Sequence, residues 1–271
     1  MTPKSAATLC RPACVRTGLL IVISIVLLAS WTALAQAAPP AQAGAEAKTP
    51  SPEQLLKMLK SGHPRLLIDR SGFEELGRRV KTDATLAGWD KRLRDDVKRI
   101  LAAPLPRYEI PDGLRLLSTS RRVLGDTYTL ALMFRLHGDR RCLERLWQEM
   151  ETVAAFKDFN PKHFLDTAEM THALAIAYDW LYDAWSEPQR TVIREAIVRH
   201  GLKPGLKVYE SRRGWPRSEH NWNQVCNGGM TLGALAIGDE ERELSGRILQ
   251  HALASIPLAM PCWLLALRPS R

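Results

Sequence analysis

Apolar residues recur at helical spacing along most of the chain after residue 53. Between Asp83 and Ala102, for example, apolar side chains stand three or four positions apart on one stripe, and the opposite face is charged. No stretch alternates apolar and polar residues in the manner of a half-buried strand. The pattern therefore predicts an all-α protein, with further helices at 54–59, 71–80, 120–136, 139–155, 164–185, 188–200, directly after Asn221, and from 244 to Met260.

Polar and glycine-containing breaks separate these helices. Gly138 and Asp139 end one helix and begin the next, and Ser186 is expected to cap a helix that carries Pro188 in its first turn. Short turns of this kind predict a series of antiparallel helical hairpins. A repeat of fixed period is not visible, which disfavours a tetratricopeptide-type array. Further caps are expected at Ser71 and Asn221, and Gly201 and Gly205 are expected to loosen the chain after His200.

The first 37 residues have the order of a secretory signal peptide: basic residues, an apolar run from Gly18 to Ser30, and small residues up to Ala37. An uncleaved membrane anchor is the alternative, because the apolar run just reaches spanning length. The alanine-rich end favours cleavage, which leaves no stable membrane anchor and a periplasmic or secreted protein. Residues 38–52 are rich in alanine and proline and are predicted to be a flexible linker before a helical domain at 53–260.

Charge narrows the class of partner. The formal net charge is +9, and loss of the three basic residues in 1–37 lowers it to +6, which favours anionic partners. Nucleic acid is the rival partner, but an export signal and the absence of a basic recognition helix argue against it.

Cysteine usage gives no sign of a disulfide framework or a zinc site. Of the five cysteines, two lie within 1–37, and the rest are the odd set Cys142, Cys226 and Cys262. Spacing leaves one pairing open, but no CxxC pair occurs. No metal and no other cofactor is predicted.

The stretch from Arg212 to Asp239 holds the densest group of binding chemistry. Arginine guanidinium groups donate paired hydrogen bonds to carboxylate or sulfate, and indole faces suit the apolar face of a sugar ring. The composition therefore indicates an acidic polysaccharide or oligosaccharide as partner. The residues predicted to bind it here are Arg213, Trp215, Arg217 and Trp222.

A second polar group lies on the predicted helix from Phe164. His163, Asp166, Glu169 and His172 are spaced by three, so they can share one helix face. We predict that Glu169, His172 and Tyr178 bind substrate, with plain hydrogen-bonded structure and core packing as the alternatives. Glu169 and His172 also match half of a bundle-type metal site, whose second half is missing.

Three segments together resemble the heparinase II/III-type polysaccharide lyases. They are the runs that begin at His63, Asp166 and His220, and the likeness extends from about His63 to Met260. It covers the helical N-terminal domain of that family only, and it implies an incomplete (α/α) toroid of antiparallel hairpins. The activity implied is β-elimination on uronic-acid polysaccharides of heparan or alginate type.

Such an elimination needs a group that neutralises the uronate carboxylate, a base for the C5 proton and an acid for the leaving oxygen. The resemblance gives the first role to Asn221, and His220 is available as the base. Trp222 stands where related patterns often have a histidine. Two alternatives stay open: a non-catalytic anionic carbohydrate-binding or scaffold protein, and a toroid glycoside hydrolase, which needs two carboxylates across a groove.

The sequence after Met260 changes character. Residues 261–271 no longer resemble the family, in which a catalytic tyrosine and β-sandwich domains follow. On this reading the domain at 53–260 is truncated, 261–271 is an aberrant tail from a frameshift or a short natural form, and little activity of the chain's own is expected.

Overall fold

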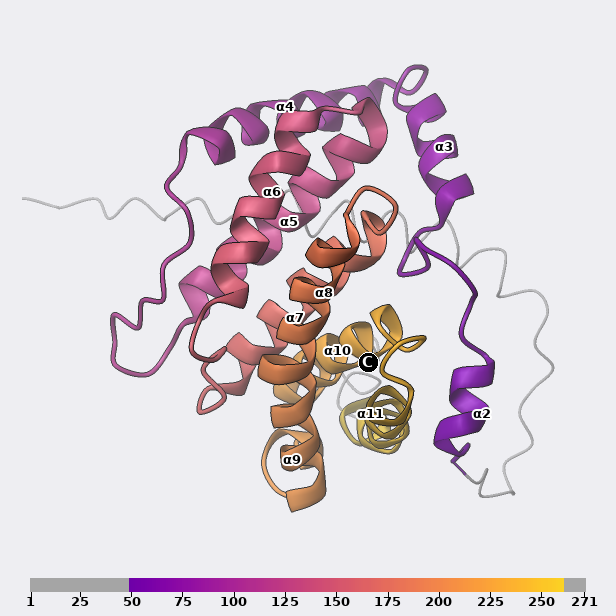
Figure 1. Cartoon of the computed structure of the whole chain (residues 1–271), viewed down its shortest axis with the longest axis vertical. Helices are drawn as coiled ribbons and strands as arrows, with labels where there is room; N and C mark the ends of the chain where they lie inside the picture. The colour runs from indigo at the N-terminus through magenta and orange to yellow at the C-terminus, as the bar shows by residue number, and fades with distance from the viewer. Residues whose placement is uncertain (1–48, 261–271) are drawn as a thin grey trace, which may run out of the picture. The chain divides into compact units, whose positions relative to one another are not determined.

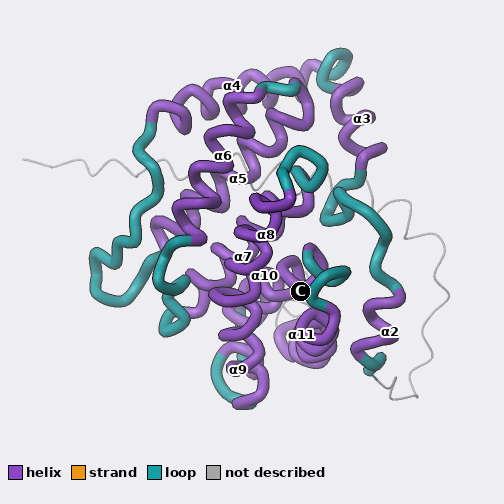
Figure 2. The backbone as a smooth tube through the Cα atoms, in the orientation of Figure 1, coloured by secondary structure: helices purple, strands orange, loops and turns teal. Residues whose placement is uncertain are grey.

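The computed structural model describes residues 49–260, and this range consists of helices and the loops that join them, with no strand (Figure 2). The all-α prediction is confirmed. No helix within the described range is both long enough and apolar enough to cross a bilayer. The signal peptide, nearly all of the predicted linker and the tail at 261–271 fall outside the described residues.

The main helices follow one another in chain order, as Figure 1 shows. They are α2 (Pro52–Lys57), α3 (Arg70–Arg79), α4 (Ala84–Ala102), α5 (Leu117–His137), α6 (Arg140–Ala154), α7 (Phe164–Trp180), α8 (Glu187–Ala196), α9 (Lys203–Ser211), α10 (Asn221–Ala236) and α11 (Arg242–Ser255). A π-helical turn, η1 (Ile197–Leu202), joins α8 to α9, and two 3-10 turns are η2 (Trp215–Arg217) and η3 (Ile256–Ala259).

Helix caps agree with the sequence in some places and correct it in others. Ser186 caps α8 in a full capping box with Gln189, as its position predicts. The predicted cap at Ser71 is wrong: the Asp69 carboxylate accepts the Gly72 N–H, and Ser71 lies inside the helix and donates to Asp69. A carboxylate is favoured at the positive N-terminal end of a helix, so it takes the cap position.

Gly201 and Gly205, expected from the sequence to loosen the chain after His200, do not interrupt the helical path there. The chain runs on from α8 through η1 into α9, and both glycines lie against neighbouring helices. A β-carbon at Gly201 would stand 2.4 Å from the Thr171 hydroxyl oxygen, and one at Gly205 would stand 2.4 Å from the Met230 sulfur. These glycines serve close helix packing, which outweighs their low helix propensity.

Helix α7 ends at Trp180, five residues before the predicted end at Trp185. The Trp185 indole N–H donates to the Ala177 carbonyl, so the chain folds back in a turn over the last turn of α7. All residues from Phe164 to Trp180 are buried except His172, which is partly exposed. Helix α7 is therefore the central helix of the core.

Helices α5, α7 and α10 run in the same direction, with α7 in contact with both of the others. At one end the Leu116 N–H donates to Asp166, and at the other Arg135 donates to the Trp180 carbonyl, which fixes α5 beside α7. For α10, His163 meets Trp222 near the start, and Tyr178 donates to Glu240 just after the end. The three N-terminal ends consequently lie at the same end of this layer.

The helices that connect this layer run the opposite way. Helix α4 is antiparallel to α5, since Asp90 pairs with His137 while the Arg107 carbonyl meets Thr119. Helix α11 returns along α10, so that Ser255 reaches Asn223. Helix α6 packs against α5, and α8 packs against both α6 and α7. The arrangement is a succession of antiparallel helix pairs.

Candidate functional site

The strongest candidate site lies where α5, α7 and α10 begin. Free N–H groups and the helix macrodipole make each N-terminal end partly positive, so three such ends side by side favour an anion. The 212–220 segment between α9 and α10 lies at the same end, because Trp215 packs on Phe164 with ring centroids 5.1 Å apart. The fold thus brings the 212–220 segment to the start of α7.

Asp166 fixes the geometry of this end. Its side chain is fully buried, and one carboxylate oxygen accepts the Leu116 N–H at 2.7 Å and the Asn160 side-chain amide at 2.8 Å. The other oxygen lies 2.8 Å from His163 Nδ1. Asp166 therefore links the start of α5, the loop before α7 that contains Asn160, and His163 into one hydrogen-bonded unit.

Trp222 covers the exposed side of this unit. Its ring stands edge-on to His163, with centroids 5.0 Å apart and planes at 81°. Trp222 is only partly buried, so part of its indole faces solvent at the end where the three helices begin. That position suits stacking against a sugar ring.

Two of the three asparagines of α10 are structural. The side-chain amide of Asn223 donates to the Pro216 carbonyl and to Ser255, and the Asn227 amide donates to the Ser255 hydroxyl at 2.8 Å. Tyr209 completes the network by donating to the Asn227 side-chain oxygen. This buried network holds the 212–220 segment against α10 and α11.

The cap of α10 is formed by His220 and not, as expected from the sequence, by Asn221. His220 is the N-cap, in extended backbone, with its Nδ1 3.5 Å from the Trp222 N–H. Asn221 is the first helical residue and is exposed, so the predicted Asn221 cap is wrong. The reason is register: the helix begins at Asn221, one residue earlier than expected. The Asn221 amide is therefore not used as a cap.

The predicted binding residues of the 212–220 segment divide into two kinds. Trp215 is 5% exposed and packs between Phe164 and Tyr209, so its ring faces are not open for stacking on a ligand. Arg213 and Arg217 are exposed, and within the described residues their guanidinium groups have no ion pair or hydrogen bond. These two arginines are free to meet an external anion.

The predicted residues on α7 lie progressively farther from this end, and Glu169 and His172 face α5, while Tyr178 donates to Glu240 just after α10. Glu169 meets Arg121 at 3.3 Å, and burial raises the pKa of its carboxyl. His172 Nε2 lies 2.7 Å from the Tyr128 hydroxyl, and burial lowers the pKa of this imidazole to about 4. Fifteen residues of helix, about 22 Å, separate Tyr178 from His163. The structure does not bring Tyr178 to Asn221.

The contact of His163 with both Asp166 and Trp222 is the feature of the site that the sequence did not predict. The spacing of three between His163 and Asp166 is visible in the sequence, and it is the signal that could have found the pair. The third member, Trp222, comes from another helix.

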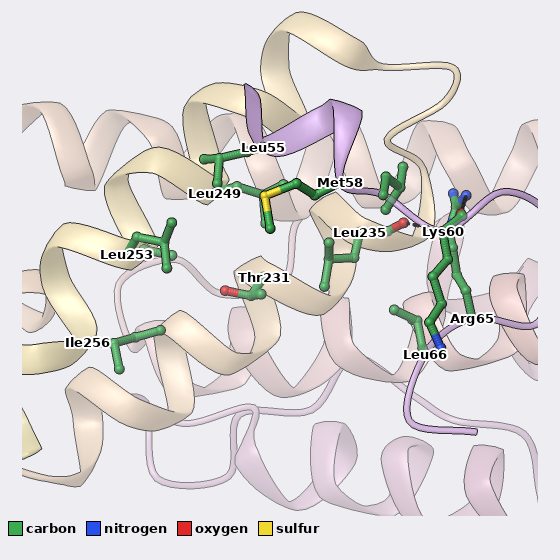
Figure 3. A pocket seen from close by; sticks show the side chains of 12 residues that line it. Leu55, Met58, Lys60, Arg65, Leu66, Thr231, Leu235, Leu249, Leu253 and Ile256 are labelled. Atoms are coloured by element: carbon green, nitrogen blue, oxygen red, sulfur yellow. Dashed lines mark hydrogen bonds between the residues drawn. The ribbon is translucent and has the colours of Figure 1, made fainter. Parts of the chain in front are cut away.

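A separate hollow of about 310 Å³ lies between α2, α10 and α11 (Figure 3). Arg65 at its edge is already bonded to Asp239 and to the Leu235 carbonyl. The hollow is lined by Thr231 and Leu235 from the C-terminal half of α10, not by its first turn, and it plays no part in the site above. Its lining is mostly apolar and includes Leu55, Met58, Leu66, Leu235, Leu249, Leu253 and Ile256.

No protein-family model matches this chain, and a search of curated proteins finds no match. Within residues 49–260 no group of three or more histidine, cysteine, aspartate or glutamate residues could hold a metal ion. The functional argument therefore depends on the geometry at the N-terminal ends of α5, α7 and α10.

Proposed function

We propose that this end of the molecule binds uronate residues of an acidic polysaccharide, and that the chain is a polysaccharide lyase-like protein built for β-elimination. The observation that carries the proposal is the convergence of three helix N-terminal ends beside two unpaired arginines and a partly exposed indole. Each of these features favours an anionic ring: helix ends and guanidinium groups attract the carboxylate, and the indole suits the sugar face.

Specific roles follow from position. Arg213 and Arg217 bind carboxylate or sulfate groups, and Trp222 stacks on a ring. Asn221, exposed at the first position of α10, donates its amide to the uronate carboxylate and stabilises the charge that develops when the C5 proton leaves. An export signal in residues 1–37 would place the protein in the periplasm or outside the cell, where such polysaccharides occur.

The helix order supports an incomplete (α/α) toroid as the architecture. Three parallel helices, α5, α7 and α10, alternate with antiparallel connecting helices, which is the repeating unit of such a fold. We propose that α5, α7 and α10 form the inner layer and that α4, α6, the α8–α9 rod and α11 form the outer one.

A non-catalytic carbohydrate-binding protein is the second candidate. The observation that favours it is that His220 is engaged as the cap of α10 and has no carboxylate partner among residues 49–260. A glycoside hydrolase is less well supported, because Asp166 is fully buried with both oxygens bonded and Glu169 is paired with Arg121.

Calorimetry with size-matched oligosaccharides tests the proposal. An oligomer of unsulfated uronate should bind with an affinity that falls as salt rises, while a neutral oligomer of the same length should not bind. Unsaturated products, followed by ultraviolet absorbance, would identify a lyase, and binding without products would identify the second candidate. Equal binding of neutral and uronate oligomers would refute both.

A further inference from the structure

We propose that His163, oriented by Asp166, is the group that takes the C5 proton of a uronate bound at the N-terminal ends of α5, α7 and α10. This inference rests on the proposed uronate site and adds a residue to it. It moves the role of base from His220 to a histidine on another helix.

The contacts of Asp166 leave His163 one usable nitrogen. One carboxylate oxygen of Asp166 accepts hydrogen bonds from the Leu116 N–H and from the Asn160 side-chain amide, so this oxygen carries no proton. The second oxygen then accepts a proton carried by His163 Nδ1, 2.8 Å away. This tautomer places the lone pair on Nε2, the arrangement in which a base is held by a third group.

Nε2 is available for such a role. It makes no hydrogen bond to any residue in the described range, and His163 retains 7% exposure next to the partly exposed Trp222. Trp222 directly follows Asn221, so the residue that neutralises the carboxylate and the residue that takes the proton belong to adjoining helix ends.

The other two histidines near the site are less suitable. His220 is exposed, serves the α10 cap through Nδ1 and, in the part of the chain that the structure describes, has no carboxylate to hold its ring. His172 faces Tyr128 of α5 rather than α10, and burial lowers its pKa to about 4. Of the three, His163 alone combines a carboxylate partner with a free nitrogen beside α10.

The proposed step balances without an oxidant or a second reactant. The C5–H bond breaks and its proton joins Nε2, while the electron pair delocalises into the uronate carboxylate that Asn221 neutralises. The pair then forms the C4–C5 double bond as the C4–O4 bond breaks, and O4 leaves with the electron pair of that bond. The imidazolium returns the proton to O4, and Asp166 stabilises the positive charge in between.

Hydrogen exchange at C5 tests the step even when elimination is slow. A uronate oligomer is incubated with the full chain in D₂O, and deuterium at C5 is measured by mass spectrometry. His163→Gln should lower the exchange rate by about 10²- to 10⁴-fold, the usual contribution of a general base. Its Kd for the oligomer should stay within about threefold, because the proton transfer group adds little to ground-state binding.

His137→Gln is the matched control. His137 also pairs with an aspartate, with its Nε2 2.6 Å from Asp90, but it lies at the opposite end of α5. This variant should exchange at the wild-type rate. Circular dichroism and thermal unfolding check that both variants are folded. If His163→Gln is not folded, the pH dependence of the exchange rate of the wild-type protein is measured in its place. That rate should rise as one imidazole loses its proton.

Each contrary result has its own meaning. Undiminished exchange in His163→Gln, loss of exchange in His220→Gln alone, or a pH profile without an imidazole step overturns the role of His163. Wild-type protein that binds the oligomer but never exchanges C5 hydrogen also overturns it, and leaves the uronate site standing. Wild-type protein that does not bind the oligomer refutes both proposals.

Discussion

Gly229 of α10 lies directly against the backbone of Ala168 in α7: a β-carbon at Gly229 would stand 2.2 Å from the Ala168 carbonyl oxygen. Two helices can approach this closely only where one of them has no side chain. The contact sets the register of α10 on α7, and that register places Trp222 over His163. The position of the candidate site therefore depends on one glycine seven residues away.

Gly229→Ala should destabilise the protein, whereas Gly228→Ala should not. The added methyl at position 229 must displace the α7 backbone, which we expect to cost about 1–3 kcal/mol or more. Gly228 has open space around it, and alanine there should stabilise the helix by roughly 0.5–1 kcal/mol. Urea unfolding of both variants measures the difference. Equal stability of the two variants would contradict the close approach.

Local patterns in the sequence predict the helices well. The stripe from Asp83 to Ala102 gives α4 to within a residue, and Ser186 with Pro188 gives the start of α8, because periodicity and caps depend only on near neighbours. The end of α7 could not be predicted, since apolar residues continue past Trp180 and the turn is fixed by the Trp185 indole. The role of Gly201 could not be predicted either, because the residue that it packs against, Thr171, is distant in sequence.

The candidate site is predictable in composition but not in arrangement. Arg213, Arg217 and Trp222 are exposed or partly exposed, as residues that bind a ligand must be. Trp215, flanked by glycine and proline with arginines one residue further on each side, has the sequence context of a surface residue and is nevertheless buried against Phe164. The hydrogen bond from Leu116 to Asp166 joins residues 50 positions apart, and no local pattern could have indicated it.

Ser255→Ala should destabilise the protein and loosen the 212–220 segment. The Ser255 hydroxyl donates to the Pro216 carbonyl at 2.7 Å and accepts from the Asn227 amide. Its loss leaves buried groups unpaired, at a cost of about 1–3 kcal/mol. Ser245→Ala is the control on the same helix, because the Ser245 hydroxyl is buried without a hydrogen-bond partner in the described range. Hydrogen exchange of the 212–220 amides should rise in the first variant only.

Glu149→Gln should stabilise the protein above neutral pH. Burial raises the pKa of Glu149 to about 7, against 4.5 as the ordinary value. Below pH 4.5 both states hold the proton, and between pH 4.5 and 7 the unfolded chain ionises first, so stability falls as pH rises. The variant lacks this loss, and its advantage over wild type should grow across that window by an amount on the order of 3 kcal/mol. Glu151→Gln, which removes an exposed carboxylate from the same helix, is the control variant.

His172→Gln should make the protein less sensitive to acid. The folded pKa of His172 is about 4, against 6.5 ordinarily, so the unfolded chain takes up a proton first as pH falls from 6.5 to 4. That uptake removes stability from wild type on the order of 3 kcal/mol, and the variant avoids it. Tyr128→Phe removes the neighbouring hydroxyl but keeps the partly buried imidazole, and it should stay acid-sensitive. Unfolding free energies at pH 7.5 and 4.5 give both comparisons.

Replacing Arg213 and Arg217 together by alanine should weaken binding of a uronate oligomer by about 10- to 100-fold, since a hydrogen bond to a charged group contributes about 1.5 kcal/mol. The decrease of affinity with salt should become shallower, because two of the attracting charges are gone. Arg78 and Arg79 replaced together form the control. They remove the same charge from α3, which packs against the opposite end of α5, and they already pair with Glu75 and Asp83. If the control pair weakened binding as much as the first pair, net charge alone would account for the affinity, and the 212–220 segment would have no special part in binding.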